Sequence, residues 1–281
     1  MATAVFFHAH PDDEAIATGG TMILGARGGH RIVLVCATDG AAGEADPSMI
    51  PEGETLADVR ARELSDAAQA LSVERLEFLG YKDSGMEGTA ANDDPDCFWQ
   101  ADVEEAAERL ASILQEEDAS IVTIYDPIGG YRHPDHIQVH RVGKRAAELA
   151  GTPHVFESTM NREQMKSFAD EPEWATMAEA DNGRDPEEIE AERQDFLEQE
   201  LGTPAAQITH AVDITPVIAE KKAAMIAHAS QITEDSVFLM LSDDAFARAF
   251  GQEWFVQHGA ARTGAPYLPD LFAVLDDPTA N

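Results

Sequence analysis

The chain has 281 residues, of which 44% are hydrophobic, so it is long and apolar enough for a domain with a buried core. Its 53 acidic residues against 19 Lys and Arg give a formal net charge of -34. Such a charge repels nucleic acids and anionic membranes, and we exclude both as partners. The acidic, lysine-poor composition is consistent with adaptation to concentrated salt and equally with the acidic proteome of a GC-rich bacterium.

The cellular location is inferred from what the sequence lacks. No basic region followed by a long apolar stretch stands near residue 1, and no segment approaches the ~18 apolar residues that cross a bilayer. We therefore expect a cytoplasmic protein. Cys36 lies in an apolar run and Cys97 in a distant acidic loop, a spacing that fits neither a zinc knuckle nor a redox pair.

Apolar strands alternate with helical patterns through the first half of the chain. Strands are predicted at residues 4–7, 31–38, 75–81 and 120–125. Helices are predicted between them at residues 17–29, 58–71 and 102–115. Because short connections make strand-helix-strand units right-handed and parallel, this alternation predicts an α/β fold. We expect a Rossmann-like, doubly wound, mostly parallel sheet with helices on both faces.

The pattern is weaker in the second half. Residues 181–200 are rich in acids and predict a solvated helix preceded by a loop. Residues 207–214 predict a strand and residues 218–232 a helix, and the remainder reads as irregular. Neither an internal repeat nor a Gly/Ser linker divides the chain. We expect one domain, with residues 1–157 as the α/β core and residues 158–281 as a C-terminal part that caps the site.

Two polar clusters directly follow predicted strands, which is where a doubly wound sheet binds its ligands. HAHPDDE occupies residues 8–14, and YDPIGGYRHPDHIQVH occupies residues 125–140. A divalent metal such as zinc takes three or four nitrogen and oxygen ligands, and a catalytic site leaves one position for water. Two histidines and one carboxylate from these clusters meet that requirement, so the pair of clusters predicts a metal site.

The motifs AHPDDE at residues 9–14 and HPDH at residues 133–136 resemble those of the LmbE/PIG-L family of zinc-dependent deacetylases. The segments ATDGAAGE, VRARE, FLGYKDSGM and GGYRHPDH are also similar to those of the family branch that acts on mycothiol and its precursor. The resemblance covers at least residues 4–157. It implies a zinc-dependent amidohydrolase that removes an acetyl group from a small-molecule, N-acetylated sugar conjugate of the glucosamine type.

The resemblance also implies the roles of individual residues. His10, Asp13 and His136 are expected to bind the metal, and Asp12 to act as general base toward the water that the metal activates. Asp12 and Asp13 are neighbours, so one turn can deliver both base and ligand. The same ligand set is typical of non-haem iron, so Fe²⁺ in the cell is an alternative to Zn²⁺.

Further residues are expected around the metal. By the same resemblance His133 is a charged group that stabilises the oxyanion or protonates the leaving amine, with Asp135 orienting its ring. Tyr131 is expected to polarise the carbonyl, the alternative being a ring that packs over the loop. Arg60 and Asp83 are the candidates for binding sugar hydroxyls.

Several polar residues have simpler interpretations. Arg60 and Glu63 have the i,i+3 spacing of a helix ion pair, which is the alternative to a sugar contact. Glu14 is expected to accept hydrogen bonds at a helix start. His8 is expected to lie outside the site. His140 has the spacing of a two-His zinc helix, but the family motif does not use it as a ligand.

Three rival functions follow from the same sequence. The site could cleave a larger acyl group from a thiol or sugar conjugate, or it could bind metal without turnover. The second rival is disfavoured because mere binding needs no base such as Asp12. A nicotinamide-binding enzyme is weaker still, because no GxGxxG follows the first strand. The sequence predicts no particular oligomeric state.

Overall fold

The computed structural model describes residues 1–168, 190–191, 193–194, 197–233, 236–260 and 266–276, and the statements below concern these residues. Seven strands form one sheet in the order β3-β2-β1-β4-β5-β7-β6. The strands are β1 (Thr3–His8), β2 (Arg31–Thr38), β3 (Arg75–Tyr81), β4 (Ala119–Tyr125), β5 (His154–Thr159), β6 (His210–Asp213) and β7 (Gln252–Gln257). Strands β1 to β5 pair in parallel, whereas β7 is antiparallel to both of its neighbours.

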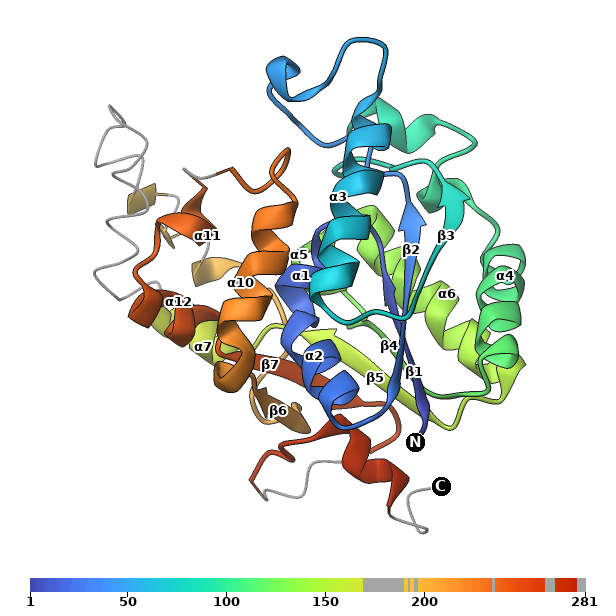
Figure 1. The fold of residues 1–281 in the computed structure, drawn as a ribbon, viewed down its shortest axis with the longest axis vertical. Helices are drawn as coiled ribbons and strands as arrows, with labels where there is room; N and C mark the ends of the chain where they lie inside the picture. The colour runs from blue at the N-terminus through green and yellow to red at the C-terminus, as the bar shows by residue number, and fades with distance from the viewer. Residues whose placement is uncertain (169–189, 192, 195–196, 234–235, 261–265, 277–281) are drawn as a thin grey trace.

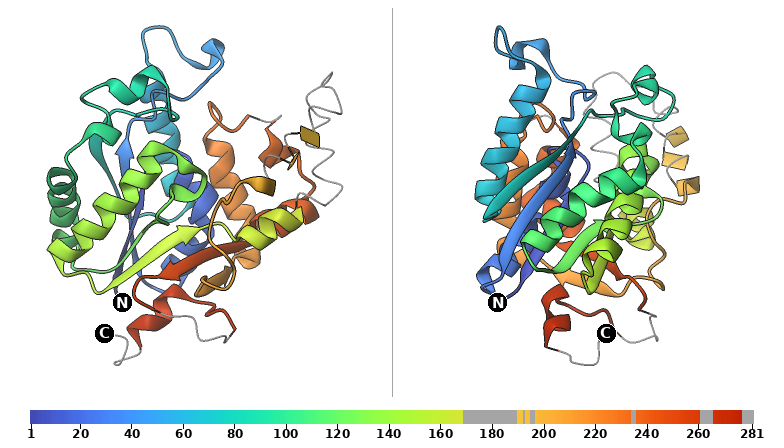
Figure 2. Two further views of the ribbon diagram at one scale, coloured as in Figure 1. Left: turned by 180° about the vertical axis from the view of Figure 1, so that it is seen from behind. Right: turned by 90° about the vertical axis from the view of Figure 1, so that its right-hand side faces the viewer.

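Helices cover both faces of the sheet (Figures 1 and 2). The α-helices are α1 (Asp13–Ala17), α2 (Gly19–Arg27), α3 (Leu56–Ala70), α4 (Val103–Glu116), α5 (Gly129–Arg132), α6 (Pro134–Ala150), α7 (Arg162–Phe168), α10 (Ile218–Ala227), α11 (Val237–Met240) and α12 (Asp243–Phe250). Short 3-10 helices lie at Pro47–Met49, Ala90–Asp93, Phe98–Gln100, Thr215–Val217 and Leu271–Leu275. Helices α2, α3 and α10 lie on one face, and α4 and α6 on the other. No helix of the described residues is long and apolar enough to span a membrane.

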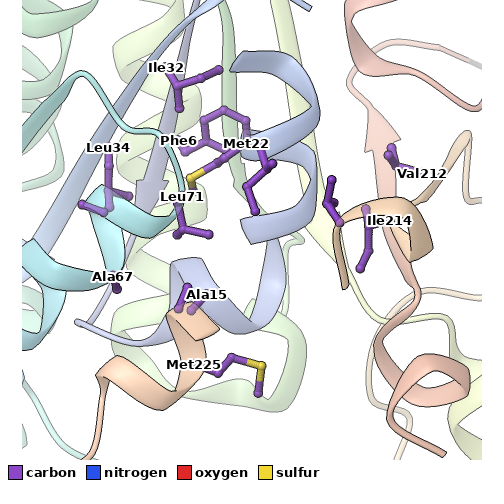
Figure 3. Packing of buried hydrophobic residues seen from close by; sticks show 14 of the residues in the cluster. Phe6, Ala15, Met22, Ile32, Leu34, Ala67, Leu71, Val212, Ile214 and Met225 are labelled. Atoms are coloured by element: carbon purple, nitrogen blue, oxygen red, sulfur yellow. The ribbon is translucent and has the colours of Figure 1, made fainter. Parts of the chain in front are cut away.

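Alternation along the buried strands produces two hydrophobic cores. Phe6 of β1 lies in the same core as Met22 of α2 and Leu71 after α3 (Figure 3). Its neighbours Val5 and Phe7 belong to the other core, with α4 and α6. A strand that is apolar on both faces must be covered on both, which is why β1 reads as a continuous apolar run.

The predicted α/β architecture is confirmed, and the differences from prediction are local. The helix expected at residues 17–29 is α2 at Gly19–Arg27. A separate helix, α1, occupies the acidic turn before it and ends beside Thr18, whose hydroxyl lies 2.8 Å from the His8 ring. Helix α10 ends at Ala227, earlier than the predicted residue 232. Strand β7 lies where the sequence reads as irregular, and it is held by pairing with β5 and β6.

Two other expectations remain open. The acidic segment 181–200 lies largely outside the described residues. The division into a core at 1–157 and a cap at 158–281 stays a prediction, although the second part contributes strands β6 and β7 to the common sheet.

The strand order places a topological switch point at the centre of the sheet. Chain connections leave β1 toward β2 on one side, while β4 lies on the other side, so this point separates β1 from β4. Ligands of doubly wound sheets bind at the carboxyl ends of the strands beside such a point. Both predicted clusters begin there, at His8 and at Tyr125, which end β1 and β4.

A buried ion pair joins the C-terminal part to the first helices. Glu253 of β7 accepts hydrogen bonds from the backbone amides of Gly20 and Thr21, both at 2.8 Å, at the start of α2. Lys221 of α10 donates to Glu253 and to the carbonyl of Ile16, both at 2.6 Å. The two charged side chains are only 1% and 2% exposed. Burial at this level makes each charge dependent on its partner.

We expect Lys221→Met to lower the free energy of unfolding by about 3–5 kcal/mol, because it leaves the Glu253 carboxylate buried without its cation. Adding Glu253→Gln should recover part of the loss, because an amide is less costly to bury than an unpaired charge. Urea unfolding followed by circular dichroism measures both. A loss below about 1 kcal/mol would mean that the α2 amides satisfy Glu253 by themselves.

Candidate active site

The turn between β1 and α1 holds Asp12 in a strained conformation. Its φ is 127°, a value that residues other than glycine rarely adopt. Its carbonyl accepts from the amides of Ala15 and Ile16 at 3.1 and 3.2 Å, so the residue forms the start of α1. Its own amide donates to Glu14 Oε2 at 3.0 Å. Strain of this kind persists only where the surroundings impose it, and it is typical of functional sites.

Asp13 joins the two clusters. Its Oδ2 lies 3.3 Å from Nδ1 of His10 and 3.4 Å from Nε2 of His136, and it also accepts from the His10 amide at 2.8 Å. An ion with four ligands at about 2.1 Å in a tetrahedron separates its ligand atoms by about 3.4 Å. The donor types and the two distances at Asp13 fit a divalent metal, whereas the groups of residues whose ligand atoms all lie close to one another contain His10 and His136 but not Asp13.

The local charges favour the metal-binding form of Asp13. Burial by itself raises the pKa of this carboxyl, but His136 and His10 outweigh burial and hold the pKa well below its ordinary value. Burial likewise opposes a charge on His10, yet hydrogen bonds with Asp13, Asp135 and Asp83 raise its pKa well above normal. Asp13 is therefore ionised at neutral pH, which is the form that binds cations.

His10 also belongs to two groups of residues whose ligand atoms lie close together. The ligand atoms of His10, Asp83, His133 and Asp135 all lie within 4.8 Å of one another, and those of His10, His133 and His136 do so too. The Nε2 of His10 is 3.1 Å from Asp135 and 3.5 Å from Asp83. These two carboxylates contact Nε2 and fix the orientation of the His10 ring, as carboxylates commonly do for histidines that bind metal through the other ring nitrogen.

Asp12 has the protonation behaviour of a base that works near neutral pH. Burial raises the pKa of its carboxyl to about 7, the Arg60 guanidinium opposes this change, and Asp13 adds to it. Nη2 of Arg60 lies 3.2 Å from Asp12 Oδ2. A pKa near the working pH is the condition for efficient proton transfer.

Arg60 is buried and occupied by protein contacts. It donates to the carbonyls of Gly40 at 2.6 Å and Pro11 at 2.5 Å, in addition to its ion pair with Asp12. The alternative of a helix ion pair with Glu63 is wrong, because Glu63 instead accepts from the amide and hydroxyl of Ser230. Arg60 thus braces the turn that carries Asp12.

Asp83 also has protein partners. Its carboxylate accepts from the amides of Gly85 at 2.8 Å and Ala42 at 3.2 Å, which ties the loop after β3 to the loop after β2. Burial raises the pKa of Asp83, but contact with His10 and the Gly85 amide lowers it below its ordinary value overall. These bonds give Asp83 a role in shaping the site, and its contact with a sugar stays a prediction.

Asp135 contacts the His133 ring through its backbone. Its carboxylate accepts from the amide and hydroxyl of Ser84 and contacts His10, whereas its backbone amide donates to Nδ1 of His133 at 3.1 Å. Asp135 is thus placed to orient the His133 ring by its backbone amide. Because Nδ1 of His133 accepts this hydrogen bond, the single ring proton of the neutral imidazole lies on Nε2.

The surroundings of His133 favour its neutral form. Burial, with His10 and His136 acting in the same direction, lowers its pKa to about 4. The charged His133 expected from the resemblance stays a prediction. The ring remains a hydrogen-bond donor through Nε2.

Tyr131 stands at the mouth of the site. Its hydroxyl lies 3.3 Å from Nε2 of His136, and the residue is 43% exposed. Gly129 precedes it with φ 65°, and a Cβ at this glycine would lie 2.6 Å from the Cβ of His136. A side chain at position 129 would clash with His136, so only glycine lets the loop approach this residue so closely. The side chain is thus placed to contact a bound substrate and the protein at once.

The remaining histidines of the two clusters have structural partners. His8 contacts the Tyr125 hydroxyl at 2.7 Å and Thr18 at 2.8 Å, and His140 contacts the Tyr125 carbonyl at 2.9 Å. The Tyr125 ring in turn stacks on His136 at 4.4 Å between centroids. Sequence reasoning missed Tyr125 and Ser84. Tyr125 is the last residue of β4, and Ser84 lies in the loop after β3. Both strands reach this edge of the sheet, and that position is the signal by which the two residues could have been found.

Comparison with known proteins identifies relatives of this chain. The family model described as PIG-L, GlcNAc-PI de-N-acetylase, matches residues 5–147. A 1D-myo-inositol 2-acetamido-2-deoxy-alpha-D-glucopyranoside deacetylase of Thermomonospora curvata is 38% identical over 263 residues, which cover 89% of this chain and 88% of that protein.

Solved structures share the fold at lower identity. The N,N'-diacetylchitobiose deacetylase of Pyrococcus horikoshii superposes with a TM-score of 0.52 at 22% identity, covering 96% of this chain and 85% of that one. GalB, the 4-carboxy-2-hydroxymuconate hydratase of Pseudomonas putida KT2440, gives 0.58 at 20% identity over 95% and 100%. Since a hydratase shares the fold, the fold alone does not define the reaction. The matches to the family model and to the full-length relative show that this chain belongs to the PIG-L, or GlcNAc-PI de-N-acetylase, family.

Proposed function

We propose that this protein is a metal-dependent N-deacetylase that hydrolyses the acetamide of a glucosamine-type sugar conjugate, releasing acetate and a free amine. The observation that carries the proposal is the strained Asp12, with its pKa raised to about 7, next to the donor set of Asp13. The relative of Thermomonospora curvata, named as the deacetylase of an inositol glucopyranoside, supports the substrate class.

His10, Asp13 and His136 would hold the metal. Zinc is the first choice, and Fe²⁺ suits the same two nitrogens and one carboxylate. When bound, a divalent ion lowers the pKa of a water molecule and polarises a carbonyl. Asp83 and Asp135 keep the His10 ring in place from behind.

Asp12 serves as the general base. As water adds to the amide carbon, its proton passes to the Asp12 carboxylate, which Arg60 holds in position at 3.2 Å. The contact with Arg60 also keeps the pKa of Asp12 from rising further, so that enough carboxylate is present at neutral pH. When the C–N bond breaks, the proton is delivered to the departing nitrogen.

His133 and Tyr131 are the donors for the negative charge that develops on the carbonyl oxygen. His133 donates through Nε2, since its Nδ1 is held by the Asp135 amide. The Tyr131 hydroxyl lies beside His136 at the open side of the site. Burial raises the pKa of Tyr131 above its ordinary value, which keeps the hydroxyl protonated as a donor.

Metal removal tests the proposal as a whole. We expect acetate release from N-acetylglucosaminyl-inositol to stop after exhaustive chelation and to return when Zn²⁺ or Fe²⁺ is added. Measurement of the free amine released from the N-acetyl substrate and from a bulky-acyl analogue separates a deacetylase from an amidase of larger groups. Full activity in metal-free protein would end the proposal, and faster cleavage of the bulky analogue would favour the amidase.

Substitutions separate the proposed roles of neighbouring residues. Asp12→Asn should lower kcat by roughly 10²–10⁴-fold and retain metal, because it removes the base only. His136→Ala should lose the metal itself, because it removes a ligand. Metal content by mass spectrometry and kcat from acetate release check both. Equal metal loss in the two variants would contradict the division of roles.

A further inference from the structure

The segment after α10 reaches back to the catalytic turn. Helix α10 packs against α1 and α3, and it is followed by a turn in which the amides of Gln231 and Ile232 donate to the carbonyl of His228 at 2.9 and 2.7 Å. This turn redirects the chain at His228. The side chains of His228 and Ser230 then face the first helices of the protein.

His228 and Glu14 form an ion pair that is fully buried. Nε2 of His228 lies 2.6 Å from Glu14 Oε1, and both side chains are 0% exposed. Within the described residues the other ring nitrogen, Nδ1, has no hydrogen-bond partner. Within the described residues, Glu14 is thus the partner with which the His228 ring makes its hydrogen bond.

Glu14 links His228 to Asp12, because each of its two carboxylate oxygens contacts one of these residues. While Oε1 is held by His228, Oε2 accepts the backbone amide of Asp12 at 3.0 Å. That amide belongs to the residue with φ 127°, so its hydrogen bond is one of the restraints that keep the strained turn in place. A rotation of the Glu14 carboxylate would release it.

Ser230 in the same segment provides a second, indirect connection to Asp12, through Glu63 and helix α3. Ser230 donates from its amide at 2.8 Å and its hydroxyl at 2.6 Å to Glu63 of α3. Glu63 lies one turn after Arg60, which binds Asp12 and the Pro11 carbonyl. The segment thereby fixes the helix that carries the guanidinium opposite Asp12.

We propose that His228 is a positioning residue for the general base, acting through Glu14 on the backbone of Asp12. The proposal rests on the function proposed above. It assigns to the C-terminal part of the chain a direct share in the geometry of the HAHPDDE turn. His228 contacts neither the metal ligands nor the expected position of the substrate, so its effect is on how Asp12 is held.

Three variants on α10 or at its end test this role. His228→Phe keeps an aromatic ring but cannot donate to Glu14. His228→Gln places an amide donor near the former Nε2. Met225→Ala is the matched control, because Met225 is buried in the core beside α1 (Figure 3) and its truncation weakens the same helix without changing a polar contact.

We expect His228→Phe to lower kcat by about tenfold or more with KM within about twofold and with metal content unchanged, because a displaced base slows chemistry more than binding. His228→Gln should recover most of kcat. Met225→Ala should lower Tm while keeping kcat. Should His228→Phe fail to fold, His228→Asn, whose amide is too short to reach Glu14, takes its place.

Amide hydrogen exchange of the peptide covering residues 9–17 gives a readout that needs no turnover. Exchange should be faster in His228→Phe than in Met225→Ala at equal loss of Tm. Unchanged kcat in His228→Phe, no recovery in His228→Gln, or equal exchange in the two variants would each overturn the positioning role. A wild-type protein that is inactive on every acetamide would instead refute the proposed function, and the exchange data would still decide the role of His228.

Discussion

The parallel pairing of β1 with β4 is the contact on which the site depends. Val5 lies opposite Val122 and Phe6 opposite Thr123, so the two strands reach the same edge of the sheet together. One strand then delivers His10 and Asp13, the other delivers His136, and Asp13 is left within 3.4 Å of both rings. Apolar burial on both faces of β1 fixes this register, because a slip by one residue would move its side chains to the wrong face.

Charge is distributed unevenly in this protein. The chain carries a formal net charge of -34 and only five lysines, yet Lys221 is buried against Glu253 and Arg60 against Asp12. His228 is buried against Glu14 in the same way. In an acidic protein these cations are placed where a carboxylate must stay ionised inside the fold, and they hold the first two helices and the catalytic turn together.

The sequence predicted the parts of the molecule that local patterns encode. Continuous apolar runs identified the central strands, and the two motifs identified His10 and His136, which the structure brings within 3.4 Å of Asp13. It did not predict β7, because this strand is held by pairing between β5 and β6 that no local pattern records. The partners of Glu14 and Asp135 were missed for the same reason. His228 is 214 positions from Glu14, and Ser84 is 51 positions from Asp135.

The position of His228 and Glu253 in the chain has a consequence for synthesis. The HAHPDDE motif, which supplies the proposed base, is synthesised long before residue 228, so its Glu14 receives a buried partner only when that residue has been made. The amides of Gly20 and Thr21 at the start of α2 likewise wait for residue 253. A nascent chain therefore carries the donor set of Asp13 before the partners of Glu14 and of the α2 amides exist.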